Sequence, residues 1–192
     1  DFLNEISADD IFEGLLGYGL FANKLPPCFT AESLYRFYKS GRGEELNPVK
    51  RRDYIIFDSQ RNTMIPRRFG IPVPHAYYRL CKSLSDSWGK IRHSMIHATA
   101  GQEYLVSRIH LRKMKRDRAL FSMEYKNWKI DGNPEPDLLL GNKYLVKTDI
   151  STCFPSIYTH SIPWALAGKE EGKRNRSIDE WFNDIDKQCQ NC

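Results

Sequence analysis

One stretch of the sequence constrains the fold more than any other, Tyr144-Leu-Val-Lys-Thr-Asp-Ile-Ser-Thr-Cys-Phe-Pro-Ser-Ile157. Its apolar start ends at a single carboxylate, Asp149, and an aromatic residue, Phe154, follows five positions later. The pattern predicts a strand over residues 143–149, then a turn, then a helix that begins near Ser156. A chain with this order places Asp149 where a strand ends and the backbone turns away.

The apolar residues of that strand, Leu145 and Val146, are expected to be buried on one or both faces of a sheet. An aspartate at the end of such a strand can offer its oxygens at a cleft, and oxygen ligands of this kind suit Mg²⁺. The other interpretation is structural, because a strand-end aspartate can simply cap the turn that follows it. The residue types alone leave both interpretations open.

The order Asp149-Ile-Ser-Thr-Cys-Phe-Pro-Ser-Ile157 resembles the first palm motif of reverse transcriptases, as found in group II intron, retron and abortive-infection or antiphage types. The resemblance implies an RNA-directed DNA polymerase, used in bacterial antiphage defence, that transfers nucleotides with Mg²⁺ from dNTPs onto an RNA or DNA template-primer. It implies that the catalytic residue Asp149 and the backbone carbonyl of Ile150 hold the metal. It also implies that Phe154 packs under the sugar and obstructs a 2′-hydroxyl, so that deoxynucleotides are preferred.

Enzymes of this family carry a second acidic motif, an aromatic-x-Asp-Asp hairpin, downstream of the first. The only Asp-Asp pair in this sequence is Asp9-Asp10, far upstream of Asp149. We therefore expect an N-terminal fragment, with a fingers-like region and N-terminal helices over residues 1–142 and the start of the palm over residues 143–192. We expect the fragment alone to be inactive and the full-length parent to be the enzyme, because two-metal chemistry needs more than one carboxylate.

Positive charge gathers in the segment before the motif. Residues 106–113 alternate between apolar and basic side chains, which predicts a strand with a cationic face. In the family that the motif resembles, a fingers hairpin precedes the palm and presents cations to the triphosphate and the template. The resemblance implies nucleotide binding by Arg108, Arg112 and Lys113, and nucleic-acid binding by Arg67, Arg68, Lys115 and Arg116. The alternative for each basic cluster is an ordinary solvated face.

The composition argues against a membrane span and leaves a nucleic-acid partner open. The 192 residues carry a net charge of +5, a modest excess that is compatible with a polyanionic partner without being diagnostic of one. No run of about 18 apolar residues occurs, and the N-terminus lacks the pattern of a signal peptide. Five cysteines form an odd set with irregular spacing, which favours a reduced, cytoplasmic protein. Cys189-x-x-Cys192 lacks the second pair that a zinc ribbon needs.

The order of predicted elements indicates an α+β fold, helix-rich with a small antiparallel sheet. The resemblance implies that this fold is the fingers and partial palm of a right-hand polymerase. We expect Ser7 to cap a first helix whose pattern Gly17-Tyr-Gly19 breaks. We expect Thr30 to cap a second helix that ends at Gly41 or Gly43.

Further along the chain, a strand is predicted over residues 52–58. A proline-punctuated loop over residues 66–74 follows and carries two of the candidate arginines. Pro74 is expected to lie in the first turn of a long core helix, where its missing N–H is no loss. Residues 169–176 have the composition of a charged loop, and residues 178–185 have the spacing of a final amphipathic helix.

Two other classes of function remain open. A non-catalytic nucleic-acid-binding module would use the basic strand and loop alone, and its binding would be unchanged by Asp149→Ala. A protein-interaction domain would use the terminal helices, and it would not bind nucleic acid even at low salt. His93 and His97 fall four residues apart on one predicted helix face, but no third metal ligand accompanies them.

Overall fold

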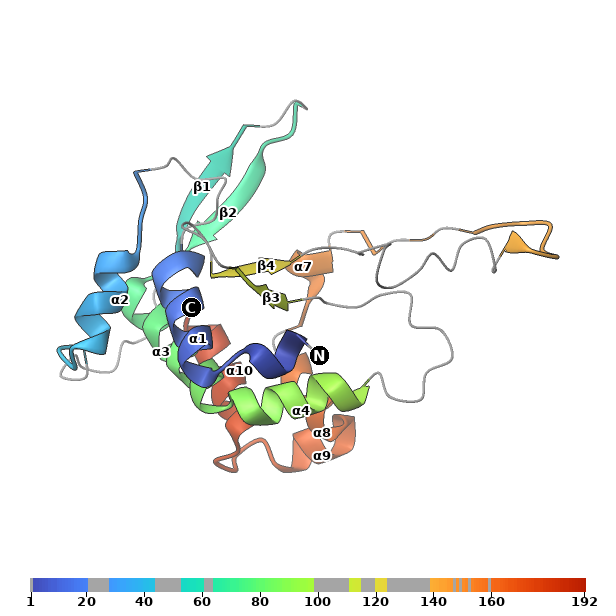
Figure 1. The fold of residues 1–192 in the computed structure, drawn as a ribbon. Helices are drawn as coiled ribbons and strands as arrows, with labels where there is room; N and C mark the ends of the chain where they lie inside the picture. The colour runs from blue at the N-terminus through green and yellow to red at the C-terminus, as the bar shows by residue number, and fades with distance from the viewer. Residues whose placement is uncertain are drawn as a thin grey trace.

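The computed structural model shows a helix-rich α+β fold with two small pairs of antiparallel strands (Figure 1). The residues that the structure describes are 2–20, 28–43, 53–60, 64–98, 111–114, 120–123, 139–146, 148, 150–151, 153–158 and 160–192. Among them, no helix is both long enough and apolar enough to cross a membrane. The predicted α+β class, rich in helix with little sheet, is confirmed at this level.

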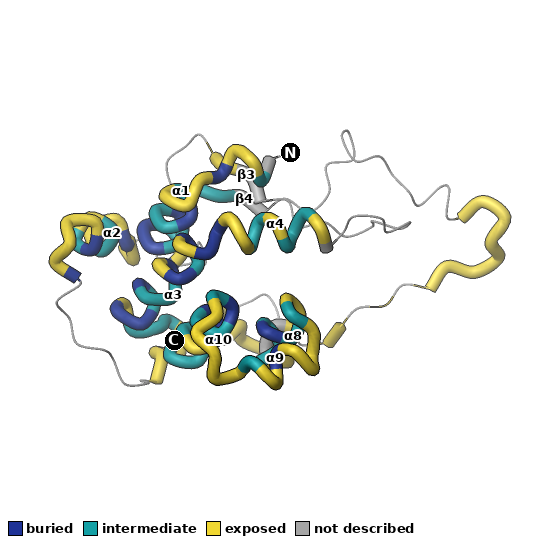
Figure 2. Tube along the Cα trace, turned by 90° about the horizontal axis from the view of Figure 1, so that it is seen from below, coloured by how far each residue is buried: buried dark blue, intermediate teal, exposed yellow. Residues whose placement is uncertain are grey.

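The elements follow one another along the chain in two groups. The first group is η1 (Phe2–Glu5), α1 (Ala8–Glu13), η2 (Gly14–Gly19), α2 (Glu32–Lys39), β1 (Ile55–Ser59), β2 (Arg67–Ile71), α3 (Pro74–Asp86) and α4 (Trp88–Ala98). The second group is β3 (Leu111–Lys113), β4 (Phe121–Met123), α7 (Cys153–Ser156), α8 (Ser161–Ala167), α9 (Lys169–Arg174) and α10 (Trp181–Asn191). Helix α3 is central, because α1, α4 and α10 all pack against it (Figures 1 and 2).

Helix α1 begins at the cap that the sequence predicts. Ser7 Oγ accepts a hydrogen bond from Asp10 N at 3.1 Å, and Asp10 Oδ2 accepts one from Ser7 N at 3.0 Å. This reciprocal arrangement satisfies backbone donors that the start of a helix otherwise leaves without partners.

The predicted break over Gly17-Tyr-Gly19 is confirmed at its last residue, because the helical turns pass through Gly17 and end at Gly19. The chain continues past α1 as η2, a stretch of wide π-helical turns that runs to Gly19. Leu16 is fully buried there, and a Cβ on Gly17 would lie 3.5 Å from the Cβ of Tyr35 in α2. That distance is an ordinary van der Waals contact, so a small side chain would also fit at this position. Burial of the neighbouring Leu16 outweighs the cost of glycine inside a helix, which is about 1 kcal/mol.

The ends of α2 and the start of α3 show which cap signals are reliable. The predicted cap at Thr30 is wrong, because α2 begins after Ala31 and no side chain caps it. Gly41, with a φ of 80°, follows the end of α2 as predicted, since glycine adopts this left-handed conformation without strain. Pro74 lies in the first turn of α3, also as predicted.

Two clusters of buried side chains hold the helices together. The first joins η2, α2 and α3 and consists of Leu16, Tyr38, Tyr78 and Cys81. The second joins the N-terminal helices to α4 and consists of Ile6, Ile11 and Trp88. In the first cluster the rings of Tyr38 and Tyr78 stack with their centroids 4.0 Å apart. Tyr78 and Trp88 are each 6% exposed and belong to the core.

Strands β1 and β2 form an antiparallel pair that projects from the helices (Figure 1). Strand β1 confirms the strand predicted over residues 52–58, with later bounds. The loop predicted over residues 66–74 is wrong at its centre, because β2 occupies Arg67–Ile71. Pro66 and Pro72 flank β2, at positions where a missing N–H breaks no pairing with β1. The prolines therefore mark the ends of a strand and not the course of a loop.

Strand β3 pairs with β4 so that Lys113 lies opposite Phe121. It confirms the end of the strand predicted over residues 106–113, whereas residues 106–110 lie outside the described residues. The ring of Phe121 packs closely on η2, where any side chain at Gly14 would overlap it. The short pair is thereby anchored to the N-terminal helices.

The predicted strand over residues 143–149 is wrong. Residues 143–146 and residue 148 are described and are neither strand nor helix. Leu145 and Val146 are not buried but 49% and 81% exposed. Figure 2 shows this segment exposed along its length and apart from the helices. An apolar run forms a strand only where a neighbour supplies hydrogen bonds, and no strand among the described residues pairs with it.

The C-terminal helices confirm one prediction and correct another. Gly168, with a φ of 84°, ends α8. The charged loop predicted over residues 169–176 is wrong, because α9 occupies most of it. Acidic residues lie in the first turn of α9 and basic residues in its last turn, which complements the helix dipole. The final helix predicted over residues 178–185 is confirmed as α10, with later bounds.

Helix α10 connects the C-terminal helices to the N-terminal core. Its residues Phe182 and Ile185 are buried, and Ser83 Oγ in α3 donates a hydrogen bond to Asp184 Oδ2. Residues from both predicted regions, 1–142 and 143–192, therefore share one packed interface.

A buried histidine in α3 makes the core sensitive to acid. His75 Nε2 accepts a hydrogen bond from Arg79 Nε at 3.3 Å, so the ring proton lies on Nδ1, which is 3.2 Å from Tyr38 Oη. Burial, together with the nearby Arg79, lowers the pKa of His75 below its ordinary value. The unfolded chain therefore takes up this proton more readily than the folded chain. The stability is complete above about pH 6.5 and is lost as the pH falls through the folded pKa.

We expect the urea midpoint of the chain to fall as the pH is lowered from about 7.5 to about 5.5, and His75→Phe to lose that part of the dependence. Phenylalanine binds no proton, so its contribution to stability does not titrate. Tryptophan fluorescence at a series of pH values measures the midpoint. The exposed His93, changed to Phe, is the control and should keep the wild-type dependence. An unaltered pH dependence in His75→Phe would contradict this account.

Candidate functional site

The structure describes only part of the motif that the sequence selects as catalytic. Asp149 lies outside the described residues, whereas Ile150 is described and is 69% exposed. The prediction of a helix that begins near Ser156 is wrong, because α7 is a single turn over Cys153–Ser156 and ends where that helix was expected to start. This turn contains Phe154, whose side chain is outside the described part. The backbone therefore turns into a helix almost directly after the predicted metal ligands.

The two arginines predicted to bind nucleic acid lie on β2, and each contacts a neighbour. Arg68 Nε lies 3.1 Å from Asp58 Oδ1 on the paired strand. The Arg67 guanidinium lies 5.2 Å from the centroid of the Phe69 ring. Successive residues of a strand face opposite sides, so the two cations do not form one patch. Both arginines are exposed, and contacts of this kind contribute little when they are exposed to water.

Lys113, predicted to bind nucleotide, forms an ion pair with the N-terminal helix. Its Nζ lies 2.6 Å from Asp10 Oδ1. Partial burial raises the pKa of Asp10, but hydrogen bonds from Lys113 and Ser7 outweigh that effect, and the pKa lies below its ordinary value. Arg112 belongs to β3 by its backbone, and its side chain is outside the described part. The other candidates outside the described residues are Arg108, Lys115 and Arg116.

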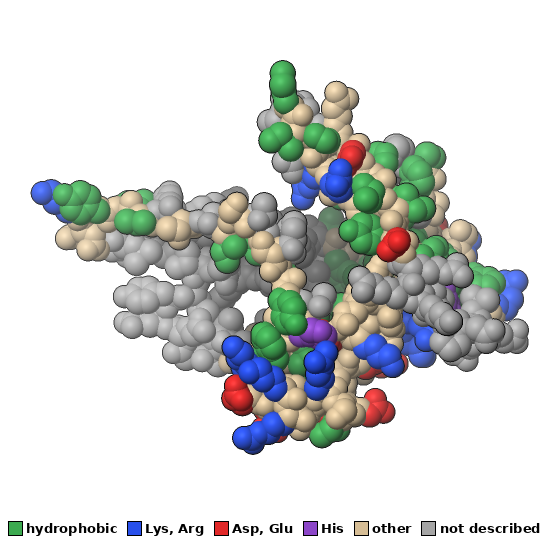
Figure 3. Space-filling model, turned by 180° about the vertical axis from the view of Figure 1, so that it is seen from behind, with side chains coloured by type: hydrophobic (Ala, Val, Ile, Leu, Met, Phe, Trp, Pro, Cys, Tyr) green, Lys and Arg blue, Asp and Glu red, His purple; other side chains and the backbone are tan. Residues whose placement is uncertain are grey.

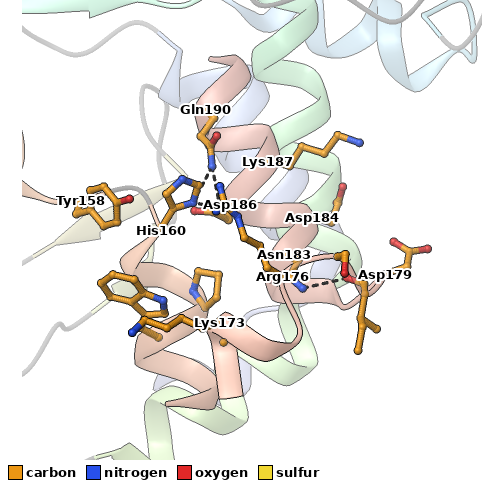
Figure 4. A pocket seen from close by; sticks show the side chains of 15 residues that line it. Tyr158, His160, Lys173, Arg176, Asp179, Asn183, Asp184, Asp186, Lys187 and Gln190 are labelled. Atoms are coloured by element: carbon orange, nitrogen blue, oxygen red, sulfur yellow. Dashed lines mark hydrogen bonds and ion pairs between the residues drawn. The ribbon is translucent and has the colours of Figure 1, made fainter. Parts of the chain in front are cut away.

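A cavity of about 440 Å³ lies among the C-terminal helices, directly beyond the motif (Figure 4). It is lined by residues of α8, α9 and α10 together with Tyr158, which follows the last residue of the motif. Gly172 is buried where α8 meets α9, and a Cβ there would lie 3.0 Å from Trp164 Cδ1. The missing side chain lets α9 approach α8 closely. The volume is typical of ligand pockets, which span about 300–1,000 Å³.

Three polar side chains form the inner wall of this cavity (Figure 4). Asp186 Oδ2 lies 2.9 Å from His160 Nδ1 and 2.8 Å from Gln190 Nε2. Both nitrogens donate to the same oxygen, which explains why they also lie 3.2 Å from each other without a hydrogen bond of their own. Asp186 is 7% exposed, and its other oxygen, Oδ1, is buried without a partner among the described residues.

This arrangement fixes the orientation of His160, the residue that precedes α8. Because Nδ1 donates to Asp186, Nε2 is the ring atom left for other partners, as donor or acceptor according to its charge. A buried carboxylate that orients an imidazole is a construction common to binding and catalytic sites. The cavity is therefore a built polar site and not an accidental gap between helices.

The sequence gives little sign of this cavity. His160 and Asp186 are 26 residues apart, and only the packing of α8 on α10 brings them together. The one local signal is the basic composition of residues 169–176, which carry Lys173 and Arg176. That signal predicts surface exposure but says nothing about the histidine beside it.

No described group of three or more His, Cys, Asp or Glu side chains could hold a metal ion. Comparison of the chain with protein-family models, with curated proteins and with solved structures found no match. The function is therefore inferred from the residues themselves.

The cysteines differ in burial and therefore in expected reactivity. Cys153 belongs to the Asp149–Ile157 motif, whereas Cys81 lies in the core. Cys28 and Cys153 are exposed, whereas Cys81 is fully buried and burial raises its pKa to about 12. Since the thiolate is the reactive form, a thiol reagent at about pH 8 should modify Cys81 about 10³-fold more slowly than Cys153. Mass-spectrometric mapping over time measures the rates, and the chain in denaturant is the control. Rapid native modification of Cys81 would show that the core is not packed as described.

Proposed function

We propose that this chain supplies the fingers and the first palm motif of an RNA-directed DNA polymerase, a reverse transcriptase with the right-hand architecture. The observation that carries the proposal is the residue order from Asp149 to Ile157, a carboxylate, an aromatic five residues later, and then Pro-Ser-Ile. The exposure of Ile150 supports it, because this described neighbour of Asp149 is accessible from solvent.

The donor types at the motif fit Mg²⁺. Asp149 would supply a carboxylate and Ile150 a backbone carbonyl, and both are hard oxygen ligands of the kind that Mg²⁺ combines with water and substrate phosphates. When bound, the ions activate the attacking 3′-hydroxyl and neutralise the leaving pyrophosphate. Phe154 would act through its position, because an aromatic ring packed under the sugar would leave no space for a 2′-hydroxyl. The preferred substrates are therefore dNTPs.

The basic residues of the first half would hold the triphosphate and the RNA or DNA template-primer. A guanidinium such as that of Arg112 binds two phosphate oxygens at once. Arg68 would exchange Asp58 for phosphate at little cost, because both members of that pair are exposed to water. Lys113 would have to leave Asp10, which is partly buried. A role in bacterial antiphage defence belongs to the same proposal.

The proposal includes a second acidic motif outside these 192 residues. No Asp-Asp pair follows Asp149 in the sequence, and one carboxylate does not complete a two-metal site. The 192-residue chain should therefore extend no primer by itself, whereas the full reading frame that contains it should do so.

Primer extension tests the proposal. The full reading frame is incubated with a primed RNA template, dNTPs and Mg²⁺, and parallel reactions receive EDTA or rNTPs. We expect DNA synthesis that needs Mg²⁺ and prefers dNTPs. Absence of Mg²⁺-dependent synthesis on any primed or unprimed substrate would overturn the polymerase assignment. Robust synthesis by the 192 residues alone would overturn the division into an incomplete palm and a missing motif.

A further inference from the structure

The charged side chains around the C-terminal cavity are mixed in sign. Three carboxylates and three Lys or Arg side chains line it. In the space-filling view, Lys and Arg side chains lie among Asp and Glu side chains on this face of the molecule (Figure 3). Charge there favours neither an anion nor a cation. A pair of histidines on α4 gives a clearer indication of a ligand, because it depends on the geometry of two nitrogen donors.

His93 and His97 lie one helical turn apart on the exposed side of α4. Side chains four residues apart in a helix share a face, and both of these are exposed. Their ring centroids are 4.0 Å apart, and the ring planes are tilted by 53°. Figure 2 shows exposed and less exposed residues alternating along α4. The helix therefore holds two imidazoles side by side in solvent.

The opposite side of α4 fixes the backbone that carries this pair. Trp88 is buried, and Ile91 and Met95 pack against the same cluster of buried side chains. The backbone of α4 is thus held by the core before any ligand binds. Only side-chain rotation is then needed for the two rings to point at one ion, which reduces the cost of binding.

Neither imidazole is committed to another group. Among the described residues, the recorded contact of each ring is with the other ring, and neither has a hydrogen-bond or ion-pair partner. His160 is different, because its Nδ1 is held by Asp186. A ligand that binds His93 and His97 therefore displaces water and breaks no contact within the described protein.

We propose that His93 and His97 together bind a divalent transition-metal ion of the kind that prefers nitrogen ligands, such as Ni²⁺, Cu²⁺ or Zn²⁺. Imidazole nitrogen binds Zn²⁺ at about 2.0–2.1 Å, and two histidines four residues apart on a helix hold one ion in known zinc sites. Water would fill the remaining positions, because the described residues contain no cluster of three or more ligating side chains. Mg²⁺ prefers oxygen, so this ion differs from the one proposed for the polymerase motif.

The basic residues of α4 do not prevent this binding. Lys90 shares the exposed side of the helix, but its Nζ lies 5.9 Å from the centroid of the Trp181 ring on α10. Arg92 is rotated by about 100° around the helix axis from His93. Charges that are exposed to water repel an ion weakly and are screened by salt, whereas a metal–nitrogen bond forms by direct coordination.

Calorimetric titration of the 192-residue chain with Ni²⁺ tests the inference. The exposed thiols of Cys28 and Cys153 are first alkylated, so that they do not bind the ion, and Mg²⁺ is present in excess. We expect Ni²⁺ binding that Mg²⁺ does not displace. His93→Gln and His97→Gln should each weaken this binding by about tenfold or more, because a single imidazole cannot chelate the ion.

Two further variants are matched controls. Gly89 is exposed, lies four residues before His93, and has open space where a Cβ would be. Gly89→His in the His97→Gln background therefore creates a new pair with the same spacing and should restore Ni²⁺ binding to within about threefold of wild type. Lys90→Gln changes a neighbour on the same face that is not a ligand and should stay within about twofold. Thermal melting without metal shows whether each variant is folded.

Weaker binding in both histidine variants, with recovery in the Gly89→His variant, supports the inference. A wild-type chain that binds no Ni²⁺ overturns it. Equal binding by wild type and both histidine variants also overturns it, because another group then holds the ion. Displacement by Mg²⁺ would indicate oxygen ligands and has the same consequence. None of these residues belongs to the Asp149–Ile157 motif, so primer extension that needs Asp149 would persist after any of these failures.

Discussion

Asp149→Asn in the full reading frame should lower primer extension by about 10³-fold or more. The change replaces a charged oxygen ligand by a neutral amide of the same shape, so the site loses affinity and charge for Mg²⁺ without a change in volume. Metal ions contribute several kcal/mol of transition-state stabilisation to such reactions, and about 4 kcal/mol corresponds to 10³-fold in rate. The measurement is the initial rate of dNTP incorporation at saturating Mg²⁺.

The control for Asp149→Asn is Asp53→Asn, which alters an exposed aspartate ahead of β1. It should retain wild-type incorporation within about twofold. An Asp149→Asn protein that incorporates dNTPs at the wild-type rate would show that this carboxylate only caps a turn. If neither wild type nor variant synthesises DNA but both bind strands equally, the protein is a binding module.

Most signals that act within about four residues were predicted correctly from the sequence, with the Thr30 cap as the exception. The Ser7 cap, the left-handed Gly41 after α2 and Pro74 in the first turn of α3 each depend on backbone groups of their immediate neighbours. The chemistry of the side chain and the position in the turn together decide these conformations. No knowledge of the rest of the fold is required for them.

Features that depend on distant partners were predicted poorly. Gly17 lies within a helical stretch whose residue Leu16 is fully buried, and Arg67–Ile71 forms a strand because β1 pairs with it. Leu145 and Val146 show the opposite case, since an apolar run that no described strand accompanies remains exposed. In each case the presence or absence of a tertiary contact decides the conformation, and local preference does not.

The two candidate sites, the Asp149–Ile157 motif and the cavity between α8, α9 and α10, also differ in how far their residues are separated in sequence. The motif around Asp149 is contiguous in sequence, so the order of its residues is enough to identify it. The cavity is assembled from α8, α9 and α10, and the contact between His160 and Asp186 spans two helices. Neither residue belongs to a short motif, because the buried carboxylate acquires its role only when α10 packs beside α8.

Trp88 is the residue whose loss should most destabilise the fold. It is the first residue of α4, is 6% exposed and packs with Ile6 and Ile11. Its Nε1 donates a hydrogen bond to the backbone oxygen of Ile6 at 2.7 Å, so one side chain joins the N-terminal helices to α4. Trp88→Ala leaves a large cavity and removes the donor for a buried carbonyl. The expected loss in the free energy of unfolding is about 3–5 kcal/mol.

A loss of that size is a large part of the total stability of a domain, which is about 5–15 kcal/mol. Urea unfolding followed by far-UV circular dichroism measures it, because the signal does not depend on the tryptophan that is removed. Trp88→Phe separates the two contributions, since it keeps most of the apolar volume and loses only the hydrogen bond. It should cost about 1–3 kcal/mol, clearly less than the alanine variant. Equal losses in both variants would mean that the bond to Ile6, and not the packing of the indole, fixes the N-terminal helices on α4.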